Sequence, residues 1–279
     1  MAEYALSGRE YAPPRRSTKS ARRAEGSSGT KAALAAGLVG ILLSALGLVL
    51  YPLTELRRFE LTGSTRVSAG ELALMAGVAP GTHIFDIDPG RMAALAAAHP
   101  LLESVEVRAR FPDTLSFSVR ERTAVAVLYA RSSDGRQRAH CVDRHGVVFA
   151  QADHLAVNAA LPVLSGIEVT GLSYGMSLGD ELTPLLESLG DLADSEPALA
   201  GALSELRLVA RPDAPPEVII YPANYRLPVR ARADLDAELV KSMLLILDVV
   251  ETGGFGPSIR ELDLRSDTYV FRTKEAVSG

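Results

Sequence analysis

The residues best suited to chemistry lie in one stretch, HCVDRHGVVF, which runs from His140 to Phe149. It holds Cys141, the single cysteine of the chain, together with His140 and His145, two of its five histidines. A thiol close to imidazoles suits either a zinc site or an activated thiol nucleophile. His154 follows near enough to be considered with them.

The spacing of these residues favours structure over chemistry. His140 and His145 alone fall within the spacing of a zinc-ligand pair, but the four residues together do not match the usual pairing of finger-like sites. Neighbours on a strand point to opposite faces, so the side chains of His140 and Cys141 should diverge. The D-R-H-G turn between two apolar runs predicts a hairpin, with Cys141 as a small buried hydrophobe.

A second candidate is Gly171–Gly175, which matches the G-x-S-x-G pattern of a serine nucleophile. That pattern requires a helix directly after the serine and a histidine later in the chain. Met176–Gly179 does not read as a helix, and the last histidine is His154. The match at Ser173 is therefore interpreted as chance, and we predict no catalytic residue, no cofactor-binding site and no metal site.

An apolar segment near the N-terminus would attach the rest of the chain to a membrane. Ala32–Leu50 contains no charge, and the uncharged run extends to Thr54. At about 1.5 Å per residue, a helix of this length crosses a hydrocarbon core of roughly 30 Å. We predict that residues 32–54 span a membrane, with Tyr51 at the interface.

The charge distribution orients this span. Residues 1–31 carry seven basic and three acidic side chains, a net charge of +4, which leaves −9 for the rest of a chain whose total is −5. We predict that the basic tail is disordered and lies in the cytoplasm, and that the chain crosses the cell (inner) membrane once, which places the later domains outside the cytoplasm. We predict no nucleic-acid binding, because the rest of the chain is acidic. A cleaved signal peptide is the alternative, but the apolar run exceeds the usual length of about 7–15 residues.

Residues 55–123 read as a small module of the order β-α-α-β-β. Ser68 and Glu71 form the pattern of a capping box, and Asp88 precedes a proline in the manner of a helix N-cap, with Asp86 in the turn before it. Two alternating segments then predict a hairpin. Its outer face is expected to be solvated, and the arginines on it are Arg108, Arg110, Arg120 and Arg122.

Residues 124–275 read as a larger module of mixed strands and helices, followed by a frayed end at 276–279. The predicted strands are 124–130, 138–142, 147–151, 204–210, 217–221, 225–230, 259–265 and 268–272. Helices are predicted at 183–193 and from Asp234 to about Glu251, the second with a leucine-rich buried stripe. The predicted fold class is thus α+β, with one N-terminal transmembrane helix, a small module and a larger mixed α/β domain that ends in an exposed edge strand.

Several motifs, taken in order, resemble the FtsQ/DivIB family of bacterial cell-division proteins. The β-α-α-β-β module resembles a POTRA domain, and FELTGSTRVS and HPLLESVEVRARFPDTLSFSVRER resemble its parts. CVDRHGVVF resembles the family hairpin V-D-x-x-G-x-V-F, LPVLSG resembles the turn L-P-x-L-x-G, and IRELDLR resembles the strand before the terminal edge. Ala124 departs from the pattern, because the family often has proline there.

The resemblance implies a scaffold of the division septum that has no enzymatic activity. It implies that the POTRA domain contacts other divisome components. It also implies that the second module, the FtsQ-type β domain, recruits small bitopic coiled-coil partners of the FtsB and FtsL (DivIC and FtsL) type by strand addition. Carried over by motif, the partner-binding residues are Arg265, Ser266, Asp267, Thr268, Tyr269, Val270 and Phe271.

Two other functions remain open from the residues. A POTRA protein of secretion or outer-membrane biogenesis would usually carry several such domains or a membrane barrel. An anchored envelope hydrolase would use Ser173 or Cys141. The aromatic residues Tyr269 and Phe271 could also simply pack in the core rather than line an edge.

Overall fold

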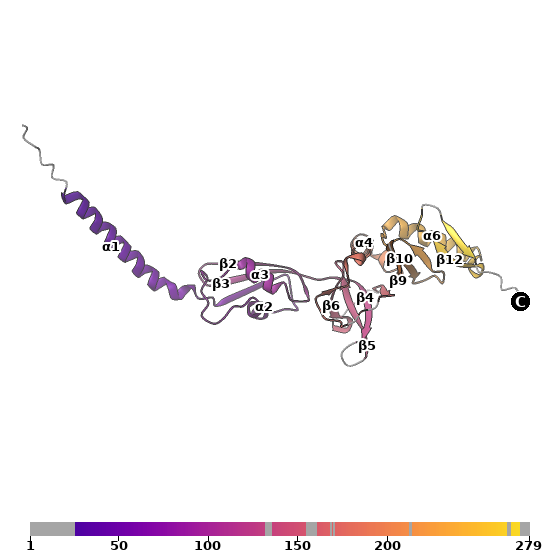
Figure 1. The fold of residues 1–279 in the computed structure, drawn as a ribbon, viewed down its shortest axis with the longest axis horizontal. Helices are drawn as coiled ribbons and strands as arrows, with labels where there is room; N and C mark the ends of the chain where they lie inside the picture. The colour runs from indigo at the N-terminus through magenta and orange to yellow at the C-terminus, as the bar shows by residue number, and fades with distance from the viewer. Residues whose placement is uncertain are drawn as a thin grey trace, which may run out of the picture. The chain divides into compact units, whose positions relative to one another are not determined.

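The computed structural model describes residues 26–131, 136–154, 161–167, 169, 171–211, 214–266 and 269–273. The chain divides between Leu53 and Thr54 into two units. The first contains helix α1 (Gly26–Leu50), which continues into the short helix η1 (Tyr51–Thr54) (Figure 1). Segment Gly29–Thr54 is long and apolar enough to cross a membrane, and none of its most apolar stretch is buried by protein.

Helix α1 begins six residues before the predicted start at Ala32, so Gly26–Lys31 are helical rather than part of the tail. Extending a helix by one residue costs little once a long apolar helix has nucleated. The rest of the predicted tail, residues 1–25, lies outside the described residues, as do residues 276–279.

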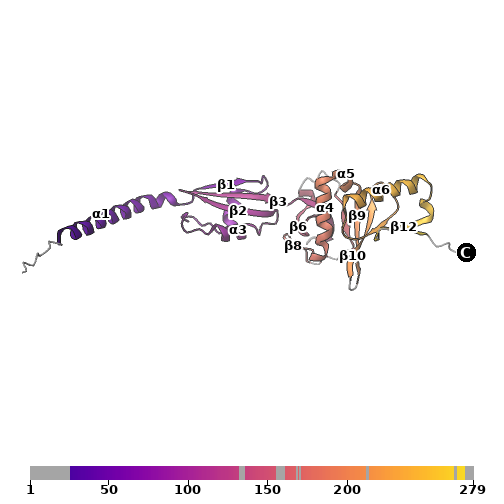
Figure 2. The same ribbon diagram turned by 90° about the horizontal axis from the view of Figure 1, so that it is seen from above.

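The module after the anchor has the predicted order of elements. Its three strands form a sheet in the order β1-β3-β2, with β1 parallel to β3 and β2 antiparallel to it (Figure 2). The elements are β1 (Arg58–Thr62), α2 (Ala69–Met75), α3 (Pro89–Ala96), β2 (Leu102–Arg110) and β3 (Thr114–Glu121).

Both helices begin at the predicted caps. The Ser68 hydroxyl accepts a hydrogen bond from the Glu71 N–H at 3.1 Å, and the Asp88 carboxylate accepts from Gly90 and Arg91. The helices pack on the sheet through Leu72, Leu102, Leu115 and Phe117, which are fully buried. The alternation along β3 thus places every second residue in the core.

The second module is built on a sheet of ten strands. Their order is β13-β12-β11-β10-β9-β7-β4-β5-β6-β8. The strands are β4 (Ala124–Arg131), β5 (Gln137–Asp143), β6 (Val147–Gln151), β7 (Val163–Ser165), β8 (Met176–Ser177), β9 (Leu203–Arg211), β10 (Ala214–Pro222), β11 (Val229–Ala231), β12 (Ile259–Asp263) and β13 (Val270–Thr273).

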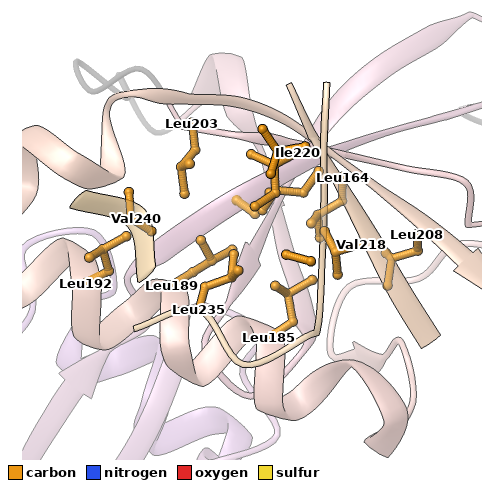
Figure 3. Packing of buried hydrophobic residues seen from close by; sticks show 14 of the residues in the cluster. Leu164, Leu185, Leu189, Leu192, Leu203, Leu208, Val218, Ile220, Leu235 and Val240 are labelled. Carbon is orange, nitrogen blue, oxygen red and sulfur yellow. The ribbon is translucent and has the colours of Figure 1, made fainter. Parts of the chain in front are cut away.

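Two helices supply most of the cover for this sheet. They are α4 (Thr183–Ser195) and α6 (Ala237–Thr252), with the single turn α5 (Pro197–Ala200) between them in sequence. Leu185 and Leu189 of α4 gather with Val218 of the sheet and with Leu235 and Val240 near the start of α6 (Figure 3). The core therefore relies on aliphatic side chains, in a chain without tryptophan.

Two segments of the second module differ from the prediction. LPVLSG was expected to be a turn, but Val163–Ser165 form β7, which lies between β4 and β9 and is parallel to both. Only Gly166 turns there, with a φ of 77°. The strand expected at 225–230 is shortened to β11, because Pro228 has no N–H to donate.

Candidate partner-binding edge

Strand β13 lies at one end of the ten-stranded sheet. It pairs antiparallel with β12, with Leu262 opposite Phe271 and Asp263 opposite Val270. Among the described strands, nothing pairs with its other side. The N–H and C=O groups on that side can therefore accept another strand.

The side chains at this edge are unusually exposed for apolar residues. Tyr269, Val270 and Phe271 are 51%, 47% and 44% exposed. Phe271 shares a face with its partner Leu262, which is fully buried, so the ring borders the core without being enclosed by it. An added strand would cover the exposed part of this ring.

Ion pairs hold the edge strand to the sheet. Arg265, just after β12, donates to Asp263 at 2.6 and 2.9 Å. Arg272 of β13 donates to the same carboxylate at 3.0 Å. Arg265 also reaches Glu217 of β10 at 2.5 Å, and Glu217 accepts from Arg230 of β11 at 3.0 Å. These contacts link the edge strand to the third strand inward.

The arginines determine the charge state of this network. Hydrogen bonds from Arg265 hold the pKa of Asp263 far below its usual range. Burial raises the pKa of Glu217, but hydrogen bonds from Arg265 and Arg230 outweigh it and lower the pKa overall. Both carboxylates are therefore charged at neutral pH, and they tie β13 to a rigid support.

The seven predicted partner-binding residues are only partly brought together. Arg265 is two-thirds buried and committed to Asp263 and Glu217, while Ser266 is exposed next to it. Tyr269, Val270 and Phe271 form the exposed edge. Asp267 and Thr268 lie outside the described residues.

The cysteine–histidine segment folds as the predicted hairpin. β5 and β6 are joined by Asp143–Gly146, and Gly146 has a φ of 75°. Cys141 is fully buried beside Phe149 and Ala150, and burial raises the pKa of its thiol to about 11. A thiol with so high a pKa is not poised as a nucleophile.

The histidines of this segment have different surroundings. His140 is buried, its Nδ1 lies 3.3 Å from the Tyr174 hydroxyl, and burial lowers its pKa. His145 lies on the turn with Nε2 3.2 Å from Glu103, whereas the side chain of His154 is outside the described part of the chain. In that part, no group of three or more His, Cys, Asp or Glu could hold a metal ion.

Ser173 is exposed in a turn that leads into strand β8. The nucleophile pattern needs a helix at that point. Its N–H faces the sulfur of Met176 at 3.3 Å. The surroundings of Ser173 therefore do not match the geometry that its sequence pattern would require.

Comparison with known proteins agrees with the predicted POTRA domain. A family model described as "POTRA domain, FtsQ-type" matches residues 54–122. "Cell division protein FtsQ" of Mycolicibacterium smegmatis is 35% identical over 124 residues, which is 44% of this chain and 36% of that protein. The chain is similar to the FtsQ proteins of bacterial cell division.

Other members of the family align over longer segments. The FtsQ protein of Anaeromyxobacter sp. is 33% identical over 48% of this chain and 42% of its own length. That of Syntrophotalea carbinolica is 26% identical over 58% of this chain and 57% of its own. The chain thus spans about a third to a little over half of the length of these relatives.

One pair of residues was missed by sequence reasoning. Arg122 was expected on a solvated face, yet its side chain is only 15% exposed and pairs with Asp143, which is 3% exposed. Arg122 also donates to the Pro100 carbonyl at 3.1 Å, and Asp143 accepts from the N–H groups of His145 and Val147. The prediction for Arg122 was wrong because alternation along a strand cannot reveal a partner that the following module supplies.

Proposed function

We propose that this chain is a membrane-anchored scaffold of the bacterial division septum. Its segment 32–54 would hold it in the cell membrane, with the N-terminus in the cytoplasm and residues 55–123 and 124–275 outside as POTRA and β domains. The family supports a role in cell division, because the relatives carry the name cell division protein FtsQ. The apolar helix supports the anchor.

The proposal assigns recruitment to the edge of β13. The partner would be a bitopic coiled-coil protein of the FtsB or FtsL type, which would add a strand beside Tyr269–Phe271. The observation that carries this is an edge strand with exposed apolar side chains. Arg272 pairs it with Asp263 of β12, and Arg265 joins Asp263 to Glu217 of β10. Strand addition gains affinity from main-chain hydrogen bonds and specificity from alternate side chains. The POTRA domain would contact other divisome components.

The proposal needs no catalytic step. Two observations support this: the raised pKa of the buried Cys141 thiol and the strand that follows Ser173. An envelope hydrolase would require one of these residues to be activated. An electrophilic probe that labels Cys141 or Ser173 in the folded chain would therefore contradict the proposal.

The test is recovery of the coiled-coil partners from membranes with edge variants. Phe271→Lys and Tyr269→Lys should each lose most of the recovered partner, because an added strand would have to bury the ammonium group. Phe255→Lys is the matched control, since Phe255 is an aromatic residue of similar exposure, 59%, in the loop after α6. Full recovery with a folded edge variant would refute the assignment.

Localisation tests the broader role separately. A fluorescent fusion of the full chain should gather at mid-cell in dividing cells. Uniform membrane fluorescence would argue against the septal scaffold, even if β13 still bound a partner. If the fusion gathers at mid-cell but the β13 variants still recover the partner fully, the scaffold proposal stands and only the strand-addition model is refuted.

A further inference from the structure

Two phenylalanines of the POTRA domain are exposed side by side. Phe85 lies in the loop between α2 and α3 and is 71% exposed, and Phe111 lies in the turn between β2 and β3 and is 68% exposed. Their ring centroids are 6.4 Å apart. Exposed aromatic rings that touch each other, and not the core, form an apolar patch that water does not stabilise.

The chain itself places this patch next to the end of the membrane span. The Ile84 N–H donates to the carbonyl of Thr54 at 2.8 Å, and Thr54 is the last residue of the apolar segment. The Cα of Phe85 is therefore within about 10 Å of Thr54, whatever the direction in which α1 leaves the domain. Glu55 forms a β-bridge with His83, which fixes the same loop.

The second ring is attached to the same stretch. The N–H groups of Arg57 and Arg58 both donate to the carbonyl of Asp113, at 3.0 and 3.2 Å. Asp113 is two residues from Phe111, and its carboxylate also binds Arg58 at 2.6 Å. The first four residues after the span thus hold both aromatic turns.

The length of the span puts this point in the lipid interface. The uncharged run 32–54 is 23 residues long. As a helix it would extend about 34 Å, a few ångströms more than a hydrocarbon core of about 30 Å. Thr54 would then lie in the headgroup layer, where aromatic side chains are enriched in membrane proteins.

The charges around the patch are already paired within the domain. Arg57 faces Glu55 at 3.1 Å, and Arg110 faces Glu60 at 3.3 Å. With Arg58 bound to Asp113, these arginines add little unbalanced charge next to the rings. Contact with lipid would consequently depend on apolar burial more than on attraction to anionic headgroups.

We propose that Phe85 and Phe111 insert together into the outer interface of the phospholipid bilayer and form a second membrane contact beside the anchor. This contact goes beyond partner recruitment at β13 and rests only on the membrane-spanning role of α1. It would limit how far the POTRA domain can tilt away from the membrane.

The absence of tryptophan from the chain allows a direct test. Phe85→Trp and Phe111→Trp would each be reconstituted as full-length protein in phosphatidylcholine vesicles with or without brominated acyl chains. Bromine quenches tryptophan only on close approach, so both reporters should lose most of their emission in the brominated vesicles. The emission maximum of each reporter should also lie at shorter wavelength than that of a tryptophan exposed to water.

Two controls separate insertion from mere proximity. Ser104→Trp reports from an exposed site on β2, about 20 Å of strand before Arg110 and the turn that carries Phe111, and should be quenched little. Phe111→Asp in the Phe85→Trp background should reduce quenching, because the patch would then carry a charge. If the reporters were quenched no more than Ser104→Trp, or if Phe111→Asp changed nothing, the proposal would be overturned.

Flotation of the vesicles tests the anchor independently. A chain that does not float with lipid refutes the anchor and the contact together. A chain that floats with unquenched reporters refutes the contact alone and leaves the scaffold proposal standing. Circular dichroism checks that each variant is folded, and either reporter suffices for the test if the other does not fold.

Discussion

Replacing Asp143 should destabilise the chain more than any exposed charge would. Its side chain is 3% exposed and joins two modules, through Arg122 on one side and the turn N–H groups of His145 and Val147 on the other. Asp143→Ala would leave a guanidinium that is only 15% exposed without its carboxylate. It would also remove the acceptor that closes the hairpin turn.

The magnitude follows from these contacts. Breaking a buried ion pair by removing one partner costs about 3–5 kcal/mol. Arg122 keeps its bond to the Pro100 carbonyl, so we expect Asp143→Ala to cost about 3 kcal/mol, near the lower limit. Asp143→Asn retains an oxygen for the turn and should cost about 1–3 kcal/mol.

The assay is urea unfolding of the full chain in non-ionic detergent, followed by near-ultraviolet circular dichroism of the tyrosines. Arg108→Ala is the control, because Arg108 is 68% exposed and its pair with Glu106 should contribute less than about 1 kcal/mol. Removing Arg122 together with Asp143 should cost less than the two single variants added together. An Asp143→Ala variant within about 0.5 kcal/mol of the wild type would refute the reasoning.

Two further predictions concern titratable groups. Because Arg265 lowers the pKa of Asp263 in the folded state, the charged carboxylate should stabilise the fold fully above about pH 5, and this stabilisation should be lost as the pH falls further. Asp263→Asn should therefore flatten the decline of the urea midpoint in acid. An unchanged decline would contradict the assignment to Asp263. Cys141, with its pKa raised to about 11, should resist iodoacetamide in the folded chain and react after unfolding. Cys141→Ala should cost about 1 kcal/mol of packing and leave partner recovery unchanged.

Local patterns were enough to predict most elements of the fold. The caps at Ser68 and Asp88 identify two helix starts, and the D-R-H-G turn identifies the β5–β6 hairpin. These features depend on residues a few positions apart. The exposed edge at Tyr269–Phe271 was predicted from family resemblance, with core packing as an open alternative, and the structure places these side chains at the surface.

Features that depend on distant partners could not be predicted in this way. β7 is only three residues long, too short for alternation to distinguish it from a turn, and it is a strand because β4 and β9 enclose it. The burial of Arg122 depends on Asp143, 21 residues away in the next module. The contact between Phe85 and Phe111 joins two turns whose proximity follows from the path of the chain after Thr54.

The position of β7 has a consequence for how the protein is made. Strand β7 joins the part of the sheet that precedes it in sequence to the part that follows it. It does so through two residue pairs with β4 and three with β9. β4 is synthesised first, but β9 begins about forty residues after β7, so one side of β7 stays open while that length of chain is made. A chain that stalls before Leu203 would present the apolar Leu164 on an unpaired strand to its neighbours. Completion of the sheet therefore depends on uninterrupted synthesis through β9.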